Sequence, residues 1–224
     1  LAGDTPRTWH ELPASTRQIF EWFELTPSRV HLLTEPTLVE ALLVAPQAEQ
    51  LGYQGPAPAP EYLAFLECLA ERHLGPPERA GTVYVSRAGM VARMAGAAYL
   101  ADLMSQAGVV VIRPETLPLR EQLRAYRNAE RLIFEDGSAV HTLQLLGGGL
   151  GDVSILHRRP GVGPFYAVSV RPRARHFHWV EVLRGFLTPY RPSGAHISSL
   201  GMGIPDEALL LGALPELLGN DSHA

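Results

Sequence analysis

Hydrophobic and polar positions follow a regular alternation of strand and helix patterns from residue 81 onward. Four short apolar runs rich in β-branched residues predict strands, at residues 82–85, 109–112, 132–134 and 153–156. Three segments with a helical period lie between these runs, at residues 90–106, 119–128 and 138–146. Strands that alternate with helices are typical of a parallel sheet with helical crossovers. The pattern therefore predicts an α/β fold with a Rossmann-like parallel sheet.

The first third of the chain has a less regular pattern. One helix is predicted to begin near Ala14, and a second is predicted over residues 61–73. Two apolar runs bounded by prolines, residues 29–33 and 39–44, predict short strands. The proline-dense stretch at residues 52–60 indicates a linker before the second helix.

Beyond residue 156 the hydrophobic pattern weakens. Residues 165–170 predict a further strand, and residues 176–186 predict a helix. Residues 207–218 have the apolar content and length of a terminal helix.

Composition narrows the chemistry that such a fold can carry. The 224 residues include 19 basic and 23 acidic side chains, for a net charge of −4, and all 19 basic residues are arginine. Lysine-dependent sites such as P-loops and Schiff bases are therefore excluded. A bound anion must be held by guanidinium groups, helix N-termini and backbone N–H groups. Codon bias is the simpler explanation for the use of arginine in place of lysine. The acidic balance argues against nucleic acid as a partner.

Neither a membrane span nor a signal peptide is visible in the sequence. Cys68 is the single cysteine, so no disulfide within the chain is expected, and its position in the apolar stripe of a predicted helix favours a buried thiol. These features predict a cytoplasmic protein. Whether further residues precede Leu1 is left open.

The turn that follows the predicted strand at residues 132–134 is the strongest candidate site. Asp136, Gly137 and Ser138 lie between the end of that strand and the start of a helix, where unpaired N–H groups can bind an anion. Gly137 leaves room for a phosphate to approach. The same residues also suit an ordinary strand–helix turn with a capping serine, and both interpretations stay open.

Further candidates are predicted at the same edge of the sheet. Ser86 and Arg87 follow the first strand, with Arg93 beyond them, and a guanidinium group there can hold a diphosphate through two hydrogen bonds. Glu121 opens a helix and is a candidate acceptor for ribose or sugar hydroxyls. Surface arginines and a first-turn carboxylate that complements the helix dipole are the simpler interpretations of these residues.

Two other patterns predict no site. The glycine-rich residues 147–151 follow a helix and precede a strand, the reverse of the order in a dinucleotide-binding loop. His176 and His178 lack a third metal ligand at a recognisable spacing, and their separation suits a strand better than the predicted helix. No metal site is predicted.

Two runs of the sequence, YVSR (84–87) and GVVVIRPETLPLREQLRAYRNAERLIFEDGSAV (108–140), follow the order and spacing of a known family. The matching positions are Ser86, Arg87, Arg93, Pro114, Glu115, Glu121, Gln122, Asn128, Ala129, Gly137 and Ser138. On these residues the chain resembles the C-terminal half of glycosyltransferase family 61, which contains capsular-polysaccharide enzymes and xylosyl- and N-acetylglucosaminyltransferases. The match covers roughly residues 25–160, because residues 29–44 resemble the region before the family's catalytic half.

This resemblance implies part of a two-domain GT-B architecture. Residues 1–78 would be the remnant of the N-terminal Rossmann-like domain with a linker and a helix, and residues 79–224 the C-terminal nucleotide-sugar-binding domain. The implied reaction moves a sugar from a nucleotide sugar to a glycan acceptor in polysaccharide biosynthesis, with inversion and without a metal or any cofactor. The absence of an Asp-x-Asp pair from the sequence agrees with metal independence. The resemblance further implies that the protein associates with the membrane periphery or with polysaccharide-assembly proteins.

The resemblance also implies roles for individual residues. The donor would be bound by Ser86, Arg87, Arg93, Glu121, Gly137 and Ser138. Asp136 and His141 are the local candidates for the general base that deprotonates the acceptor hydroxyl.

Departures from the family pattern concern catalysis rather than fold. Residues 95–97 (Ala-Gly-Ala) replace the Asn-Glu pair that follows the family's arginine, Asp136 replaces a histidine, and residues 141–142 (His-Thr) replace Thr-Asn. A degenerate relative that serves as a binding or assembly module is therefore the second hypothesis. An unrelated α/β enzyme that uses Asp136 and His141 is the third.

Overall fold

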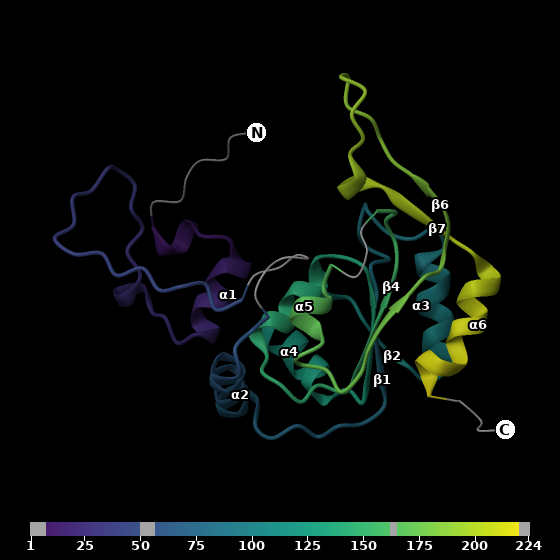
Figure 1. Cartoon of the computed structure of the whole chain (residues 1–224), viewed down its shortest axis with the longest axis horizontal. Coiled ribbons are helices and arrows are strands. Elements are labelled where there is room, and N and C mark those ends of the chain that lie inside the picture. The colour runs from purple at the N-terminus through teal and green to yellow at the C-terminus, as the bar shows by residue number, and fades with distance from the viewer. Residues whose placement is uncertain (1–7, 50–56, 162–164, 220–224) are drawn as a thin grey trace.

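The computed structural model describes residues 8–49, 57–161 and 165–219. Five parallel strands form a central sheet in the order β2-β1-β3-β4-β5, and an antiparallel hairpin pairs β6 with β7 (Figure 1). The strands of the sheet are β1 (Thr82–Val85), β2 (Val110–Ile112), β3 (Arg131–Glu135), β4 (Asp152–Leu156) and β5 (Phe177–Val180). The predicted α/β, Rossmann-like fold with a parallel sheet is confirmed.

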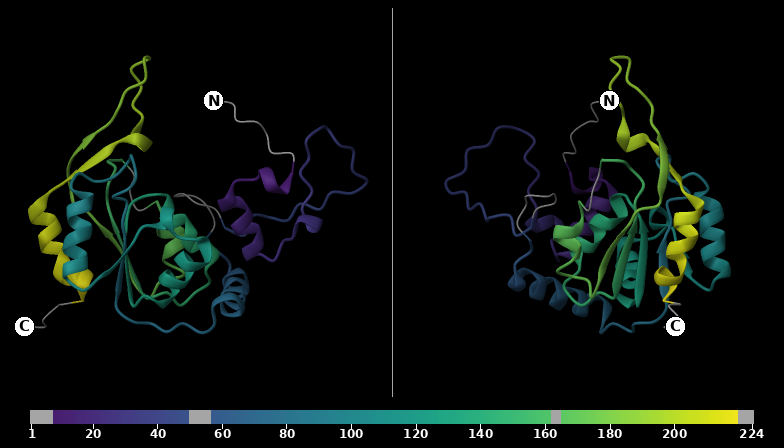
Figure 2. Two further views of the ribbon diagram at one scale, coloured as in Figure 1. Left: turned by 180° about the vertical axis from the view of Figure 1, so that it is seen from behind. Right: turned by 45° about the vertical axis from the view of Figure 1, so that its right-hand side comes forward.

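Helices cover both faces of this sheet (Figures 1 and 2). One face carries α3 (Ala97–Gln106) and α6 (Glu207–Leu218), and the other carries α4 (Leu119–Asn128), the 3₁₀ helix η4 (Ser138–Leu145) and α5 (Ala167–Val170). Successive strand residues point to opposite faces. Leu132 and Phe134 therefore pack in the core beneath α4, while Ile133 between them packs in the core beneath α3 and α6.

The N-terminal segment lies on the α4 side of the sheet (Figure 1). It contains η1 (Trp9–Glu11), α1 (Ala14–Trp22) and η2 (Pro27–Arg29), and α2 (Pro60–Leu74) follows it. Trp22 is buried in the core and donates its indole N–H to the Leu145 carbonyl at 3.1 Å. The Leu119 amide donates to the side-chain oxygen of Gln18 at 2.6 Å. These contacts attach α1 to α4 and η4.

A buried ion pair holds the far end of the same segment. Arg173 donates to both carboxylate oxygens of Glu49, at 3.0 and 2.5 Å, and Gln144 donates to the same carboxylate at 3.0 Å. The other donors of Arg173 reach the carbonyls of Leu146 and Ser169, at 2.9 and 2.6 Å. Both charged side chains are nearly inaccessible to water. The pair is therefore fully hydrogen-bonded, as a buried charge requires.

Two strand predictions in the N-terminal segment are wrong. Residues 29–33 and 39–44 form no strand, and the side chains of Leu42 and Leu43 are exposed. A strand needs a neighbouring strand to pair its backbone groups, and no strand of the described residues lies beside these runs. The first part of the predicted linker, residues 52–56, lies outside the described residues. The division into residues 1–78 and 79–224 stays a prediction.

Local predictions elsewhere are corrected as well. The helix predicted from residue 90 begins at Ala97, because residues 90–96 form turns that lead into Gly96, which has a positive φ of 73° at the N-cap. Residues 165–170 contain α5 rather than a strand, and residues 176–186 contain β5 and part of β6 rather than a helix. Cys68 is exposed on α2 and not buried.

The hairpin of β6 (Leu183–Leu187) and β7 (Met202–Pro205), with η5 (Ser198–Leu200) between them, rises beyond the carboxyl end of the sheet (Figure 1). Gly203 of β7 accepts a hydrogen bond from the Ala95 amide at 2.7 Å, and Arg158 donates to the Gly201 carbonyl at 2.8 Å. The hairpin thereby supports the turns that follow β1 and β4. Across the described ranges, no helix is both long enough and apolar enough to cross a membrane.

Candidate functional site

The sheet has a topological switch point between β1 and β3. These strands are neighbours, and the segments that follow them lie on opposite faces: β1 leads to α3 and β3 leads to η4. In open α/β sheets a crevice forms at the carboxyl ends of the strands at such a point, and ligands bind there. Both predicted anion-binding turns, at Ser86 and at Gly137, lie at this position.

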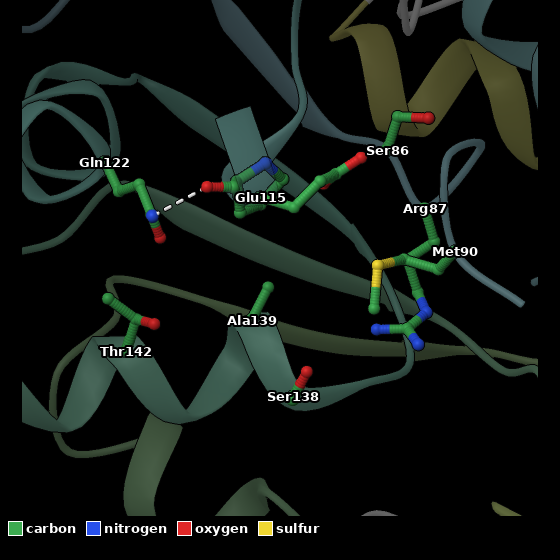
Figure 3. A pocket seen from close by; sticks show the side chains of 9 residues that line it. Ser86, Arg87, Met90, Glu115, Gln122, Ser138, Ala139 and Thr142 are labelled. Atoms are coloured by element: carbon green, nitrogen blue, oxygen red, sulfur yellow. Dashed lines mark hydrogen bonds between the residues drawn. The ribbon is translucent and has the colours of Figure 1, made fainter. Parts of the chain in front are cut away.

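A pocket of about 230 Å³ occupies this crevice (Figure 3). It is lined by Ser86, Arg87, Met90, Pro114, Glu115, Gln122, Ser138, Ala139 and Thr142. The structure thus brings together the predicted donor-binding residues Ser86, Arg87 and Ser138. Three other predicted residues are not in the lining: Gly137 packs against the Arg87 guanidinium group, Arg93 donates to the Met90 carbonyl at 2.8 Å, and Glu121 is exposed on α4.

Arg87 is held at the edge of the pocket with its guanidinium end unpaired. The side chain is only 7% exposed, and its Nε donates to the Ala92 carbonyl at 3.1 Å. Within the described residues no acceptor bonds to its terminal nitrogens, which point into the pocket beside Ser138 (Figure 3). A methyl group on Gly137 would lie 2.1 Å from Nη1. Gly137 is therefore needed so that the guanidinium group can pack against the backbone at the start of η4.

Glu135, at the end of β3, fixes the turn that carries Arg87. Its buried carboxylate accepts hydrogen bonds from the Tyr84 hydroxyl at 2.8 Å, the Arg87 amide at 2.9 Å and the Met94 amide at 3.5 Å. Burial, reinforced by the charge of Glu135, raises the pKa of Tyr84 well above its usual value. Tyr84 is therefore a neutral hydrogen-bond donor, and the loop after β1 is fastened to the end of β3.

Asp136 is engaged in a second buried network. Both carboxylate oxygens accept hydrogen bonds from Arg159 at 2.9 Å, and the Tyr166 hydroxyl donates to one of them at 3.2 Å. Burial raises the pKa of Tyr166 to about 12, so this hydroxyl stays protonated. Asp136 itself is fully buried and does not line the pocket. Accepting a proton would break its charge-assisted bonds, so this geometry opposes the predicted role as a general base.

Several charged side chains lie around the pocket. Arg158 donates to the Asp136 carbonyl and Arg159 to the Asp136 carboxylate, and the Arg87 amide donates to the Glu135 carboxylate. Burial lowers the pKa of Arg158 to about 10, which leaves it positively charged at neutral pH. Glu115 adds an anion to the lining, and among the described residues the terminal nitrogens of Arg87 have no acceptor, so they are the accessible cationic group of the pocket.

His141 lines a larger adjoining cavity of about 690 Å³. This cavity shares Glu115, Gln122 and Ser138 with the first pocket, and residues of α1 such as Gln18 form its far wall. His141 is half-buried and packs edge-to-face on the Tyr166 ring at 5.3 Å. Burial lowers its pKa, so the imidazole is neutral at neutral pH. A neutral imidazole beside a cavity can accept a proton.

The comparison with known families decides the class of protein to which this site belongs. The family model for glycosyltransferase 61 matches residues 12–147, more than half of the chain. The chain belongs to glycosyltransferase family 61. The resemblance read from the sequence is thereby confirmed, and the pocket at the switch point is the candidate site of this glycosyltransferase. No curated protein matches the sequence.

Two histidines of this glycosyltransferase lie at the opposite end of the sheet. His176 and His178, at the start of β5, pair with Asp152 at 2.9 Å and with Glu216 at 3.1 Å. In the part of the chain that the structure describes, no three histidine, cysteine or carboxylate side chains group as metal ligands do.

Several site residues of the glycosyltransferase were missed from the sequence. Arg158 and Arg159 follow β4 closely, as Arg87 follows β1, so the rule that strand ends carry function would have pointed to them. Glu135 is the last residue of β3 and follows its apolar residues directly. Its charge at the end of a buried strand was the only feature of the sequence that could have marked it. Gln122 is among the positions that match the family pattern, but the sequence assigned the acceptor role to its neighbour Glu121.

Proposed function

We propose that this glycosyltransferase moves a sugar from a nucleotide-sugar donor to a glycan acceptor in polysaccharide biosynthesis, with inversion and without a metal. The observation that carries the proposal is the unpaired guanidinium end of Arg87, packed over Gly137 at the start of η4. Diphosphates are bound by such a combination, since arginine donates bidentately and the first amides of a helix lack intrahelical acceptors. Family membership supports a sugar donor and a glycan acceptor as the substrates.

Arginine in this position supports metal independence. When the sugar leaves its donor, negative charge grows on the departing diphosphate, and fixed cations and helix amides stabilise that charge in the transition state. Arg87 and the start of η4 would supply this stabilisation, with Arg158 and Arg159 fixing the turn at Asp136 behind them. The role that a metal has in other transferases would thus fall to the guanidinium groups.

Inversion requires a base on the acceptor side of the donor sugar. Of the two predicted candidates, His141 suits this role better than Asp136, because His141 is neutral and borders the larger cavity while Asp136 is bonded to Arg159. In this proposal His141 Nε2 or Nδ1 accepts the proton of the acceptor hydroxyl as that oxygen bonds to the anomeric carbon. The bond to the donor diphosphate breaks in the same step, and the diphosphate leaves toward Arg87.

The direct test is donor binding. Thermal unfolding should be measured with UDP-, GDP- and CMP-sugars for the wild type, for Arg87→Met and for Arg124→Met, an exposed arginine of α4 that serves as the matched control. We expect one donor class to raise the melting temperature of the wild type and of Arg124→Met, and not that of Arg87→Met. No stabilisation of the wild type by any donor would refute donor binding.

A second function is a binding or assembly module that has lost catalysis. The observation that favours it concerns Asp136, which occupies the position where the family pattern has a histidine. Both of its carboxylate oxygens accept hydrogen bonds from Arg159. Sugar transfer or donor hydrolysis by the purified protein would dismiss this alternative, whereas donor binding without either reaction would support it. The cytoplasmic location and a partner at the membrane or in polysaccharide assembly stay predictions of the same proposal.

A further inference from the structure

A separate cavity of about 530 Å³ lies at the amino end of the sheet, opposite the pocket at the switch point. It lies on the face that α6 covers. Its polar lining comes from the starts of three neighbouring strands and from the last turn of α6: Arg131, Asp152, Ser154, His176, His178 and Glu216. The family match ends at residue 147, and all of these residues except Arg131 lie beyond it.

Strand register brings a buried hydroxyl group into this cavity. Ser154 of β4 lies beside His178 of β5 in the parallel ladder. Its side chain is only 8% exposed, and within the described residues its hydroxyl has no hydrogen-bond partner. A buried polar group without a partner is unfavourable, and such groups are rare in native proteins. A ligand in the cavity would supply the missing partner.

Arg131, at the start of β3, adds further donors. Its guanidinium group packs against Gly219 at the C-cap of α6, where an added methyl group would lie 2.2 Å from Cζ. Among the residues that the structure describes, no acceptor bonds to its nitrogens. The guanidinium group is therefore held in place by packing, with its N–H groups available to a ligand in the cavity.

His176 and His178 add acceptors. Nδ1 of His176 lies 2.9 Å from the Asp152 carboxylate, and Nδ1 of His178 lies 3.1 Å from that of Glu216. Hydrogen bonds from Arg175 lower the pKa of Asp152 to about 2, so this carboxylate is ionised and accepts the Nδ1–H. In a neutral imidazole, a proton on Nδ1 leaves Nε2 as an acceptor. In the described part of the chain both Nε2 atoms lack a partner.

The balance of charges and hydrogen-bonding groups indicates the class of ligand. Besides the two histidines, the charged side chains of the cavity and their ion-pair partners comprise three carboxylates and two guanidinium groups, which leave no excess positive charge for an anion. A metal ion would be repelled by Arg131, and no three side chains of the described residues group as metal ligands. Hydroxyl groups both donate and accept, so a neutral polyhydroxylated ligand matches this lining.

We infer that the cavity binds one sugar residue of a glycan, with Arg131 and Ser154 as donors and the Nε2 atoms of His176 and His178 as acceptors. The identity of the ligand rests on the proposed function, whose acceptor is a glycan, but the site is distinct from the site of transfer. The two ends of β3, at Arg131 and Glu135, are about 13 Å apart. A glycan held here is anchored away from the pocket that contains Arg87.

Sugar binding can be measured by saturation-transfer difference NMR on the full chain. The probes are glucose, galactose, mannose, xylose and N-acetylglucosamine, with inorganic phosphate and Zn²⁺ as separate ligands. We expect at least one of the neutral sugars to bind the wild type. Ser154→Ala and Arg131→Met each remove one donor and should raise the dissociation constant of that sugar about fivefold.

Matched variants separate this cavity from the rest of the protein. Ser154→Ala removes an unpaired hydroxyl, so its melting temperature should be at least that of the wild type, which keeps the test valid if Arg131→Met disturbs the end of α6. Arg124→Met, on the exposed part of α4, and Arg87→Met, at the other pocket, should bind the sugar as the wild type does.

Three results would overturn the inference: no binding of any of the sugars, equal affinity of the wild type and both cavity variants, or binding of phosphate or Zn²⁺ alone that these variants lose. The donor-dependent rise in melting temperature should persist in Ser154→Ala and Arg131→Met. A wild type that binds the sugar and shows no such rise with any donor would refute the proposed donor binding and leave the cavity site standing.

Discussion

Replacing Gly137 by alanine tests the central contact of the site without deleting any charged group. The new Cβ would lie 2.1 Å from Arg87 Nη1, 2.6 Å from Cζ and 2.9 Å from Nε, so the guanidinium group must leave its place. The backbone at Gly137 is extended, with a φ of 168°, a conformation that alanine also adopts. The substitution therefore displaces the cation and does not strain the turn.

The expected loss of affinity is large. A hydrogen bond to a charged group contributes about 1.5–3 kcal/mol, and two such bonds from Arg87 to a diphosphate make about 3–6 kcal/mol. Since about 1.4 kcal/mol corresponds to a factor of ten, the dissociation constant should rise at least about 100-fold. The fold loses the bond from Arg87 to the Ala92 carbonyl but gains about 0.4–1 kcal/mol from the lower entropy of the unfolded chain. We therefore expect the free energy of unfolding to fall by no more than about 2 kcal/mol.

The assay is titration calorimetry with pyrophosphate and with a nucleoside diphosphate that binds the wild type. Urea unfolding of the same samples measures their stability. Gly148→Ala is the matched control, because a Cβ there meets no atom within 4 Å. A folded Gly137→Ala protein with wild-type affinity would refute the role of Arg87 in binding the diphosphate. A similar loss in Gly148→Ala would show that the segment, and not the guanidinium contact, is responsible.

Three further predictions concern stability and pH. Glu49→Ala leaves the buried Arg173 guanidinium unpaired and should lower the free energy of unfolding in urea by about 3–5 kcal/mol; the double variant Glu49→Leu/Arg173→Met should recover much of that loss, and no recovery would contradict the ion-pair explanation. Gly147→Ala brings a Cβ to 2.5 Å from backbone atoms of α2 and should cost about 1–3 kcal/mol in the same assay, unlike Gly148→Ala. Burial lowers the pKa of His141 below its usual 6.5, so its contribution to stability is complete above pH 6.5 and declines as the pH falls through the lowered pKa. If it is the base, the rate of sugar transfer should be level near neutral pH and fall at acidic pH; His141→Gln should remove most activity, and an unchanged profile in that variant would exclude the role.

Periodicity predicted β1, β2, β3 and β4 because each of these four strands is a short apolar run in a sheet that has helices on both faces. Of the predicted elements after residue 81, β1, α4 and α6 have the predicted bounds. The errors fall where partners decide the structure. Residues 176–186 were predicted to form a helix. Phe177–Val180 instead forms β5, because its backbone pairs with the edge of β4 that β3 does not occupy. Residues 39–44 read as a strand and form none, because no strand of the described residues pairs with them.

For the candidate site, the sequence determined which turns carry the predicted anion-binding residues, because a glycine turn and an arginine after a strand are local features. The tertiary structure decided how these residues are used. Adjacent residues in a helix differ by about 100° in direction, so Gln122 lines the pocket while Glu121 is exposed to solvent. Asp136 looked like a free carboxylate until the chain brought Arg159 to it from 23 residues away. Local sequence thus fixes which groups reach the sheet edge, whereas long-range packing fixes which of them stay unpaired and can bind a ligand.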